Sequence, residues 1–463
     1  MRLRDGLLQR SRRPPIDIVP VASDEFQKWL KGCGARLRRW VASSDFRARP
    51  ASHCLVPRTD GSLESVLAGI GCEDDPFAIG HLPAVLPAGS YRIAADWPQD
   101  RLERAAIGWA LGTYQFTRYK KRDELKAGLV VESTTLLRRV RSQVAGLFRV
   151  RDLVNTPAQD MMPDHLAGAV KDMAGEFSAN VREIVGDALQ SKNFPAIHAV
   201  GRAASHAPRL IDLRWGKKKH PKLTLVGKGV CFDSGGLDLK TAGGMRLMKK
   251  DMGGAAHAIG LAHMIMSAGL PVRLRMLVPA VENAVAGNAY RPGDVLTSRK
   301  GITIEIDNTD AEGRVILCDA LTEAAAESPD LIIDFATLTG AARVALGTDL
   351  PAMFCNRDKV AQGLAESAER VHDPLWRLPL HRPYRELIDS PIADIANSGG
   401  GPYGGAITAA LFLQDFVPAA TPWVHFDLMA WNLRSRPGRP EGGEAMALRA
   451  VFDYLRRRYE EAA

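Results

Sequence analysis

Cysteine is scarce in this chain, with six residues among 463. None of the six belongs to a CxxC pair, and their spacing is irregular. So few cysteines in a chain of this length do not make a disulfide framework, and each is expected to act as a small buried hydrophobic residue. We therefore expect a reduced, cytoplasmic protein.

Long apolar runs are also missing. The first 15 residues are rich in arginine but lack the apolar stretch of roughly 7–15 residues that a secretory signal contains. The most apolar later segment, residues 255–270, is interrupted by His257, His263 and two glycines, and is too short to span a bilayer. We expect no association with a membrane.

Three familiar catalytic motifs are absent from the sequence. Without HExxH, a zinc peptidase of the zincin type is unsupported, and without GxSxG there is no nucleophile elbow. The segment Gly227-Lys228-Gly229 lacks the hydroxyl residue and the upstream glycine of a GxxxxGK[ST] phosphate loop. His257 and His263 are six residues apart and do not share a helix face well, so they are not expected to be metal ligands.

Positive charge is concentrated near the start of the chain. Residues 1–50 contain 12 Lys and Arg against 5 Asp and Glu, and the whole chain has a net charge of +8. Such a region could bind nucleic acid or an acidic partner. No aromatic interleaving or base-reading motif accompanies it, so a solvated surface is the preferred interpretation and a DNA-binding or scaffold role is the alternative.

The pattern of residues predicts an α/β protein of two domains. Residues 1–145 are broken often by Pro and Gly and are expected to form a smaller N-terminal α/β domain. Residues 133–153 have apolar residues at helical spacing and predict a linking helix that ends near Asn155 and Pro157. Residues 150–463 alternate strand-like and helix-like segments, which predicts a larger α/β domain with a mixed, mostly parallel sheet flanked by helices.

Three segments of the second domain carry charged residues where buried α/β segments disfavour them. They are LVGKGVCFDSGGLDLK at 225–240, MKKDMGG at 248–254 and NTDAEGR at 308–314. The first and third follow predicted strands, and the second opens a predicted helix. Because ligands collect at the carboxyl ends of strands in open α/β sheets, all three can converge on one crevice.

The charged side chains of these segments predict a dinuclear hydrolase. Asp310 and Glu312 are two residues apart and would face the same side of a roughly extended loop. Clustered carboxylates repel one another, and two divalent cations would remove that conflict. Each segment also has a simpler explanation: a glycine turn, an acidic helix N-terminus or a surface lysine. Their joint occurrence in this order makes coincidence improbable.

These three segments resemble the signature segments of the leucyl aminopeptidases, a family of cytosolic dinuclear metallopeptidases. The order and spacing of the charged residues agree with that family. The resemblance covers about residues 150–463, and its further matches are Arg151-Asp152-Leu153, Asn155, Pro157, RPGDVLTS at 291–298, ATLTGA at 336–341 and GGAITAALFL at 404–413.

The resemblance implies a set of metal ligands for Mn²⁺ or Zn²⁺. Asp233 and Glu312 would bridge the two ions, Lys228 and Asp251 would complete the tighter site, and Asp310 would complete the more exchangeable one through its side chain and backbone carbonyl. A lysine can ligate only as a neutral amine, so Lys228 would need a lowered pKa beside the metal.

The resemblance also assigns catalytic roles. Lys240 would stay charged and polarise the scissile carbonyl, and Arg314 would hold a bicarbonate ion as the general base. The nucleophile would be a hydroxide between the two metals. One metal would bind the free amino group of the peptide substrate, which selects aminopeptidase over endopeptidase activity. The metals, Lys240 and Arg314 would stabilise the tetrahedral oxyanion.

By the same resemblance, the pocket for the first side chain would be lined by Met248, Thr337, Gly340 and Met429. The family often has small residues where this chain has Met429, so the preference for leucine is left open. The resemblance further implies a homo-hexamer with active sites facing an interior cavity. A dinuclear phosphatase or amidase is a third reading, which Lys228 and Lys240 disfavour.

Overall fold

The computed structural model describes residues 5–71, 75–399 and 401–460. The chain divides into two compact units, one of residues 1–148 with 434–441 and one of residues 149–433 with 442–463. The division falls inside helix α5 (Thr134–Asn155), where the sequence predicts a helix over 133–153. Among the described residues, no helix combines the length and apolar character needed to cross a bilayer.

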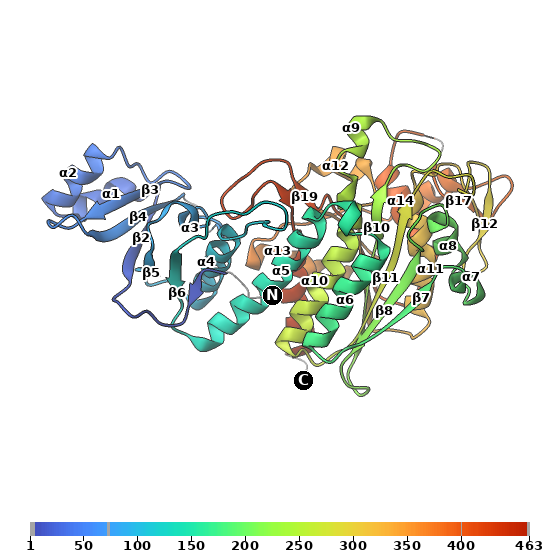
Figure 1. The fold of residues 1–463 in the computed structure, drawn as a ribbon, viewed down its shortest axis with the longest axis horizontal. Coiled ribbons are helices and arrows are strands. Elements are labelled where there is room, and N and C mark those ends of the chain that lie inside the picture. Colours follow the sequence, from blue (N-terminus) through green and yellow to red (C-terminus); the bar gives the residue numbers. More distant parts are fainter. Residues whose placement is uncertain (1–4, 72–74, 400, 461–463) are drawn as a thin grey trace. The chain divides into compact units, whose positions relative to one another are not determined.

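The first unit is built on a six-stranded sheet with the order β1-β6-β5-β2-β4-β3, drawn in blue in Figure 1. Its neighbouring strands are parallel except for β3 and β4. Its strands are β1 (Leu7–Leu8), β2 (Ile16–Ala22), β3 (His53–Pro57), β4 (Leu63–Gly71), β5 (Gly89–Ile93) and β6 (Ala127–Val130). Its helices before α5 are α1 (Phe26–Gly32), α2 (Ala35–Ser43), α3 (Leu82–Val85) and α4 (Gln99–Gly112).

The second unit is built on a nine-stranded mixed sheet with the order β16-β15-β18-β14-β9-β11-β8-β7, and β10 pairs with β11 beside this path. Strands β18, β14, β9, β11 and β10 run parallel, and the pairings of β8, β7 and β15 with their inner neighbours are antiparallel. The strands are β7 (Asn180–Val185), β8 (Arg209–Trp215), β9 (Lys222–Gly227), β10 (Gly229–Asp233), β11 (Arg273–Asn283), β14 (Leu331–Ala336), β15 (Ala352–Cys355), β16 (Trp376–Arg377) and β18 (Trp423–Asp427). The predicted fold class, a mixed and mostly parallel sheet preceded by a smaller α/β unit, is confirmed.

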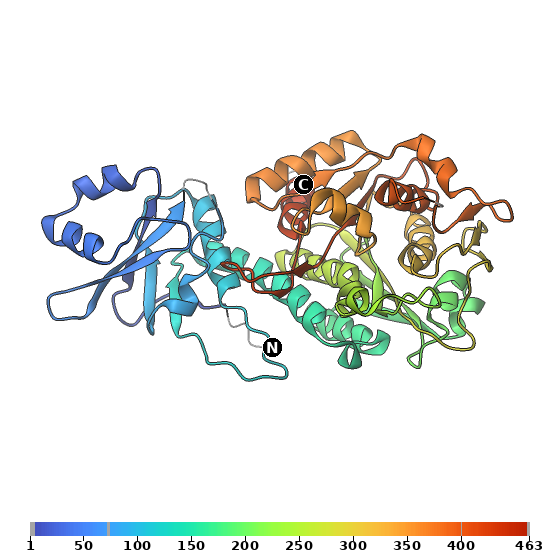
Figure 2. The ribbon, with the colours of Figure 1, turned by 90° about the horizontal axis from the view of Figure 1, so that it is seen from above.

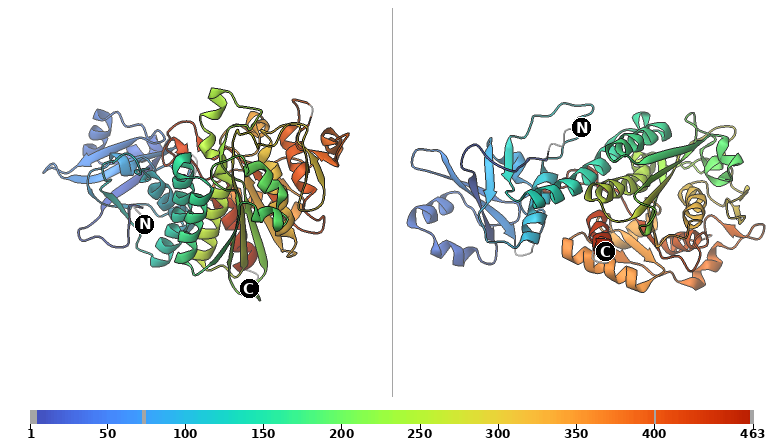
Figure 3. Two further views of the ribbon diagram at one scale, coloured as in Figure 1. Left: turned by 45° about the vertical axis from the view of Figure 1, so that its right-hand side comes forward. Right: turned by 90° about the horizontal axis from the view of Figure 1, so that it is seen from below.

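Helices cover both faces of the large sheet, as Figures 1 and 3 show. Helix α10 packs on β9 and β14, and α11 packs on β9 and β11 from the other side. The helices of this unit are η1 (Ala158–Asp160), α6 (Pro163–Glu176), α7 (Ala188–Ser191), α8 (Pro195–Gly201), α9 (Ala242–Met245), η2 (Met248–Met252), α10 (Gly253–Ala268), α11 (Glu312–Ala325), α12 (Gly340–Leu346), α13 (Asp358–Val371), η3 (Arg382–Ile388), α14 (Gly405–Gln414) and α15 (Leu448–Glu460). Strands β14 and β18 are buried throughout, and β9 is buried after its first residue, because both faces of the sheet are covered.

Two smaller sheets complete the second unit. One has the order β12-β13-β17, and the other pairs β19 with β20. Their strands are β12 (Val295–Thr297), β13 (Thr303–Glu305), β17 (Ile395–Ala396), β19 (Trp431–Asn432) and β20 (Gly442–Gly443). The segment 434–441 connects β19 to β20 but clusters with the first unit, and there Arg439 stacks on the ring of Phe77. Figure 2 shows this segment in dark red.

Candidate active site

The parallel strands of the large sheet end at one edge, and polar residues stand at each end. Lys228 follows β9, Asp233 ends β10, Asn283 ends β11 and Thr337 follows β14. Because parallel strands point their carboxyl ends the same way, these side chains come together. A cavity of about 790 Å³ lies at this edge, and it is lined by Lys228, Asp233, Asp251 and Asp310 among others.

Lys228 is held deep in the site by two carboxylates. Its Nζ lies 2.7 Å from Asp251 Oδ2 and 2.8 Å from Glu312 Oε1, and it donates a hydrogen bond of 3.1 Å to the carbonyl oxygen of Thr337. Burial alone would lower the pKa of Lys228, but Asp251, Glu312 and Asp233 outweigh burial and raise it. These carboxylates keep the Lys228 amine protonated. A metal ion that took Lys228 as a ligand would have to displace that proton.

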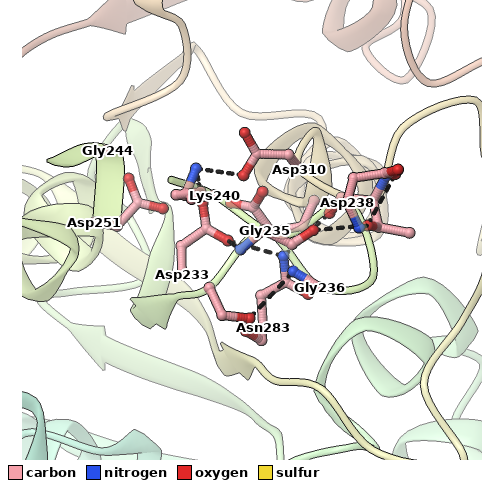
Figure 4. A network of polar contacts seen from close by, with 12 residues as sticks. Asp233, Gly235, Gly236, Asp238, Lys240, Gly244, Asp251, Asn283 and Asp310 are labelled. Atoms are coloured by element: carbon pink, nitrogen blue, oxygen red, sulfur yellow. Dashed lines mark hydrogen bonds and ion pairs between the residues drawn. The ribbon is translucent and has the colours of Figure 1, made fainter. Parts of the chain in front are cut away.

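Lys240 joins two further carboxylates, as Figure 4 shows. Its Nζ lies 2.8 Å from Asp233 Oδ2 and also pairs with Asp310 Oδ1. The loop that brings Lys240 back passes through Gly235 and Gly236, with φ values of +92° and +67°. A Cβ at Gly235 would lie 2.4 Å from the carbonyl oxygen of Asp238, so this turn requires glycine.

Asp310 and Glu312 lie near the other ligand candidates, but the backbone conformation that places them there differs from the one expected. The expectation of a roughly extended loop is wrong, because Asp310 lies in a turn and Glu312 is the first residue of α11. Even so, one carboxylate oxygen from each of Asp233, Asp310 and Glu312 lies within 4.8 Å of the others. The helix start turns the two side chains toward a common point.

The carboxylates of the cluster are poorly neutralised by the protein itself. Burial and the charge of Asp233 raise the pKa of Glu312 to about 8 and that of Asp310 to about 6. Asp251 Oδ2 and Glu312 Oε1 share the single ammonium of Lys228, at 2.7 Å and 2.8 Å, and Asp233 and Asp310 share that of Lys240. Four carboxylates paired with two lysines leave a negatively charged oxygen donor set that suits a divalent cation, so the residues present fit the metal pair that the sequence predicts.

Arg314 is buried on α11 and lines the same cavity. Its Nη1 donates a hydrogen bond of 2.8 Å to the carbonyl oxygen of Asn397, and burial lowers its pKa to about 10. Its Nε has no acceptor among the described residues. A guanidinium with donors to spare can hold a small oxyanion.

Several residues that organise the ligands were missed by the sequence reasoning. Asn283 donates from Nδ2 to Asp233 Oδ1 at 2.8 Å and to the carbonyl oxygen of Thr309 at 3.1 Å. The hydroxyl of Tyr290 donates to the same Thr309 carbonyl at 2.7 Å. Asn397 accepts from the amides of Asp307 and Asn308.

The expected side-chain pocket is brought together in part. Met248, Thr337 and Gly340 line the cavity with the metal-ligand candidates. Thr337 also donates from Oγ1 to Asp251 Oδ1 at 2.7 Å, which ties the pocket wall to a ligand candidate. Met429 is buried but is not one of the residues that line this cavity.

His257 on α10 packs inside the second unit. His257 is fully buried, its Nδ1 lies 2.6 Å from the carbonyl oxygen of Gly253, and its Nε2 accepts from the amide of Met446 at 2.9 Å. Burial lowers its pKa to about 4, so it is neutral at physiological pH. His257 is thus a core residue with a partner at each ring nitrogen.

Comparison with known proteins identifies the family. Residues 148–452 match the model of the cytosol aminopeptidase family, catalytic domain, and residues 15–132 match that of the M17 aminopeptidase, N-terminal domain. This chain belongs to the cytosol aminopeptidase family. It is therefore a metal-dependent aminopeptidase, and the resemblance noted in its sequence is confirmed.

One curated relative and two solved structures match this aminopeptidase over nearly their whole length. A probable cytosol aminopeptidase of Geobacter sp. (strain M21) is 40% identical, with 96% of this chain and 97% of the relative covered. The crystal structure of a cytosol aminopeptidase from Coxiella burnetii is 53% identical with a TM-score of 0.95, covering 98% of this chain and 100% of that one. The bottromycin maturation enzyme BotP in complex with Mn is 32% identical with a TM-score of 0.87, covering 96% and 99%.

Proposed function

We propose that this aminopeptidase releases N-terminal amino acids from peptides with two divalent cations held by a single set of side chains. The ligands of the pair are Lys228, Asp233, Asp251, Asp310 and Glu312. The observation that carries the proposal is the convergence of one carboxylate oxygen from each of Asp233, Asp310 and Glu312 within 4.8 Å of one another. Mn²⁺ or Zn²⁺ is the expected occupant, and the Mn complex of BotP supports a manganese-type site.

When bound, the cations would activate a water molecule as the nucleophile and polarise the substrate. The protein's own residues supply the remaining groups. Lys240 keeps its proton, because Asp233 and Asp310 outweigh burial and raise its pKa. A charged ammonium beside the ligands can stabilise the oxyanion that develops on the scissile carbonyl.

Every carboxylate of the cluster is assigned as a ligand, so a separate base is needed. Arg314 uses Nη1 on Asn397, and its other nitrogen atoms have no acceptor among the described residues. Bicarbonate held by Arg314 is the base in our proposal. A cytoplasmic location and a homo-hexamer complete it by analogy with the family.

The test is a panel of amino-acid anilides hydrolysed by the purified protein in the presence of Mn²⁺ or Zn²⁺. Hydrolysis is expected with the added metal, and Asp310→Ala and Lys240→Ala should each lower kcat by about a hundredfold or more. Lys218→Ala is the matched control, because Lys218 is exposed in a turn and its loss should leave the rate unchanged. No hydrolysis of any anilide in the panel would refute the proposal.

A further inference from the structure

The cavity wall beyond the metal ligands carries a buried lysine that the proposed chemistry does not use. Lys250 lines the cavity and is only 2% exposed. Within residues 5–71, 75–399 and 401–460, its side chain makes no hydrogen bond or ion pair. Burying an ammonium without a partner is costly, so its position calls for an anion from outside the chain.

Asp251 and Asp427 are the two carboxylates whose charge acts on Lys250, and both are bonded to other groups. Asp251 is paired with Lys228 and accepts the hydroxyl hydrogen of Thr337. Asp427 accepts three hydrogen bonds, from the amides of Leu338 and Thr339 and from the hydroxyl of Thr339 at 2.6 Å. Both attract Lys250 from a distance, but neither is in contact with its ammonium.

A second cation lies close to Lys250. Arg343, on α12, lines the same cavity and is near enough for its charge to act on Lys250. A Cβ added at Gly340 would lie 3.7 Å from Arg343 Nη2, so the guanidinium extends along the part of the wall that Gly340 forms. Among the described residues, Arg343 has no carboxylate partner. Two unpaired cations therefore share one wall.

The position of this wall relative to the metal ligands fixes what it can contact. The amino group and the scissile carbonyl of a peptide substrate are attached to the same Cα, and the proposed chemistry requires both at the metal ligands. The first side chain must then extend into the remainder of the cavity. Lys250 lines the same cavity as Asp251, so its side chain borders that space.

We propose that Lys250 and Arg343 select peptides whose first residue is acidic, glutamate or aspartate. This inference rests on the aminopeptidase activity proposed above. A side-chain carboxylate would give both cations a partner, whereas a leucine side chain would leave them unpaired in a desolvated pocket. The positive charges of Lys250 and Arg343 thus set the substrate class. These two residues line the cavity together with Met248 and Gly340.

The test compares glutamyl and glutaminyl anilides, which differ in charge but not in size. With the Mn²⁺-loaded full-length protein, kcat/KM for the glutamyl substrate should exceed that for the glutaminyl one by about ten- to a hundredfold. Lys250→Met should remove most of this ratio, by about tenfold or more, through a fall in kcat/KM for the glutamyl anilide. Arg343→Met should reduce the ratio less, because Arg343 is partly exposed.

Lys249→Met is the matched control. It removes one positive charge at the neighbouring position, but Lys249 Nζ donates to the carbonyl oxygen of Asn155 and lies over the ring of Trp431. The ratio of kcat/KM for the glutamyl anilide to kcat/KM for the glutaminyl anilide should be the same in Lys249→Met as in the wild type. An equal fall in this control would overturn the assignment to Lys250.

The outcomes separate this inference from the proposed function. A wild-type protein that cleaves glutaminyl or leucyl anilides better than glutamyl ones would overturn the charge selection and leave the aminopeptidase proposal standing. A preserved preference for glutamate in Lys250→Met would also overturn it. Failure to cleave any anilide with metal present would refute both.

Discussion

Gly313 follows Glu312 in α11 and leaves room for the side chain of Lys228. A Cβ at this position would lie 2.6 Å from Lys228 Cε and 2.8 Å from its Nζ. Lys228 is held on three sides, by Asp251, Glu312 and the carbonyl oxygen of Thr337, so it has no free direction in which to yield. Glycine is required here by a close approach of another side chain, and its backbone φ is ordinary for a helix.

Gly313→Ala is expected to displace the Lys228 amine from the ligand cluster. We predict a fall in kcat of about tenfold to a hundredfold with a smaller loss of stability, because misplacement of a reactive group by about 1 Å is costly. Activity and urea unfolding of the same preparation measure both effects. Gly168→Ala is the control, since a Cβ there meets nothing within 4 Å and the substitution should be neutral or stabilising. Wild-type activity in Gly313→Ala would contradict the account of Lys228.

Asn283 orients a ligand candidate without touching a metal in our proposal. Its amide holds Asp233 Oδ1 and the backbone of Thr309 at once, and it is fully buried. Asn283→Ala is expected to weaken Mn²⁺ affinity by about ten- to a hundredfold, because groups that orient ligands commonly have effects of that size. Calorimetric titration with Mn²⁺ measures it. The control Asn288→Ala removes an exposed asparagine that donates only to the carbonyl of Arg202, and an equal loss there would argue against a role for Asn283.

At the residue scale, the charged side chains could be picked out from the sequence and their organisers could not. Lys228, Asp233 and Glu312 stand out because a charge at the edge of a buried sheet is unusual. Asn283, Tyr290 and Asn397 act through bonds to segments about 20 to 90 residues distant in the chain. Polar residues of this kind also occur in ordinary loops, so only the fold distinguishes them.

At the scale of elements, the interruption between β9 and β10 at Lys228 places that side chain in the active site. Lys228 lies between the two strands. Its backbone amide donates a hydrogen bond of 3.0 Å to the carbonyl oxygen of Phe335, so the backbone remains bonded to β14 while the side chain points into the site. Gly254 lets α10 begin close to that point, since a Cβ there would lie 2.1 Å from the same Phe335 oxygen. The apolar segment that follows Gly253-Gly254 predicted α10 correctly, but the turn at Asp310 was mistaken for an extended loop because a short polar segment has no period.

The pairing of β14 with β18 buries an ion pair that predicts a pH dependence. His425 Nδ1 lies 2.6 Å from Asp334 Oδ1, and Trp423 Nε1 donates to the other oxygen at 2.6 Å. Burial would lower the pKa of His425, but Asp334, with Asp427, outweighs burial and the opposing charge of Arg314, and raises it. A raised folded-state pKa means that the charged pair stabilises fully below pH about 6.5 and is lost as the pH rises through the folded-state value.

His425→Phe should therefore destabilise the protein more at pH 6 than at pH 9. Urea unfolding of the variant and the wild type at both values measures the difference in the free energy of unfolding. Val424→Ala, on the same strand, is the control, since removing an apolar side chain should cost the same at either pH. An equal cost of His425→Phe at the two pH values would contradict a charged His425.

At the scale of the whole molecule, the alternation of strands and helices after residue 150 was enough to predict the catalytic sheet. The first unit was harder to anticipate from sequence, because Pro and Gly often break its apolar patterns. The clustering of residues 434–441 with the first unit could not be anticipated, because it depends on contacts such as Arg439 with Phe77 that join distant parts of the chain.

Assembly is the property of the whole molecule that rests on the family alone. Light scattering of the full-length protein is expected to give a mass six times the 50.4 kDa of one chain. A monomer or dimer at micromolar concentration would remove the hexamer from the proposal. It would leave the ligand set of each subunit unaffected, because all five candidates belong to one chain.

The central claim is that five side chains of one chain hold two divalent cations. Elemental analysis of the purified, dialysed protein tests it most directly. Two equivalents of Mn²⁺ or Zn²⁺ per 50.4 kDa chain are expected in the wild type, and Glu312→Gln should lose most of both because Glu312 is assigned to bridge the pair. One equivalent or none in an active wild-type preparation, or two retained in Glu312→Gln, would contradict the account.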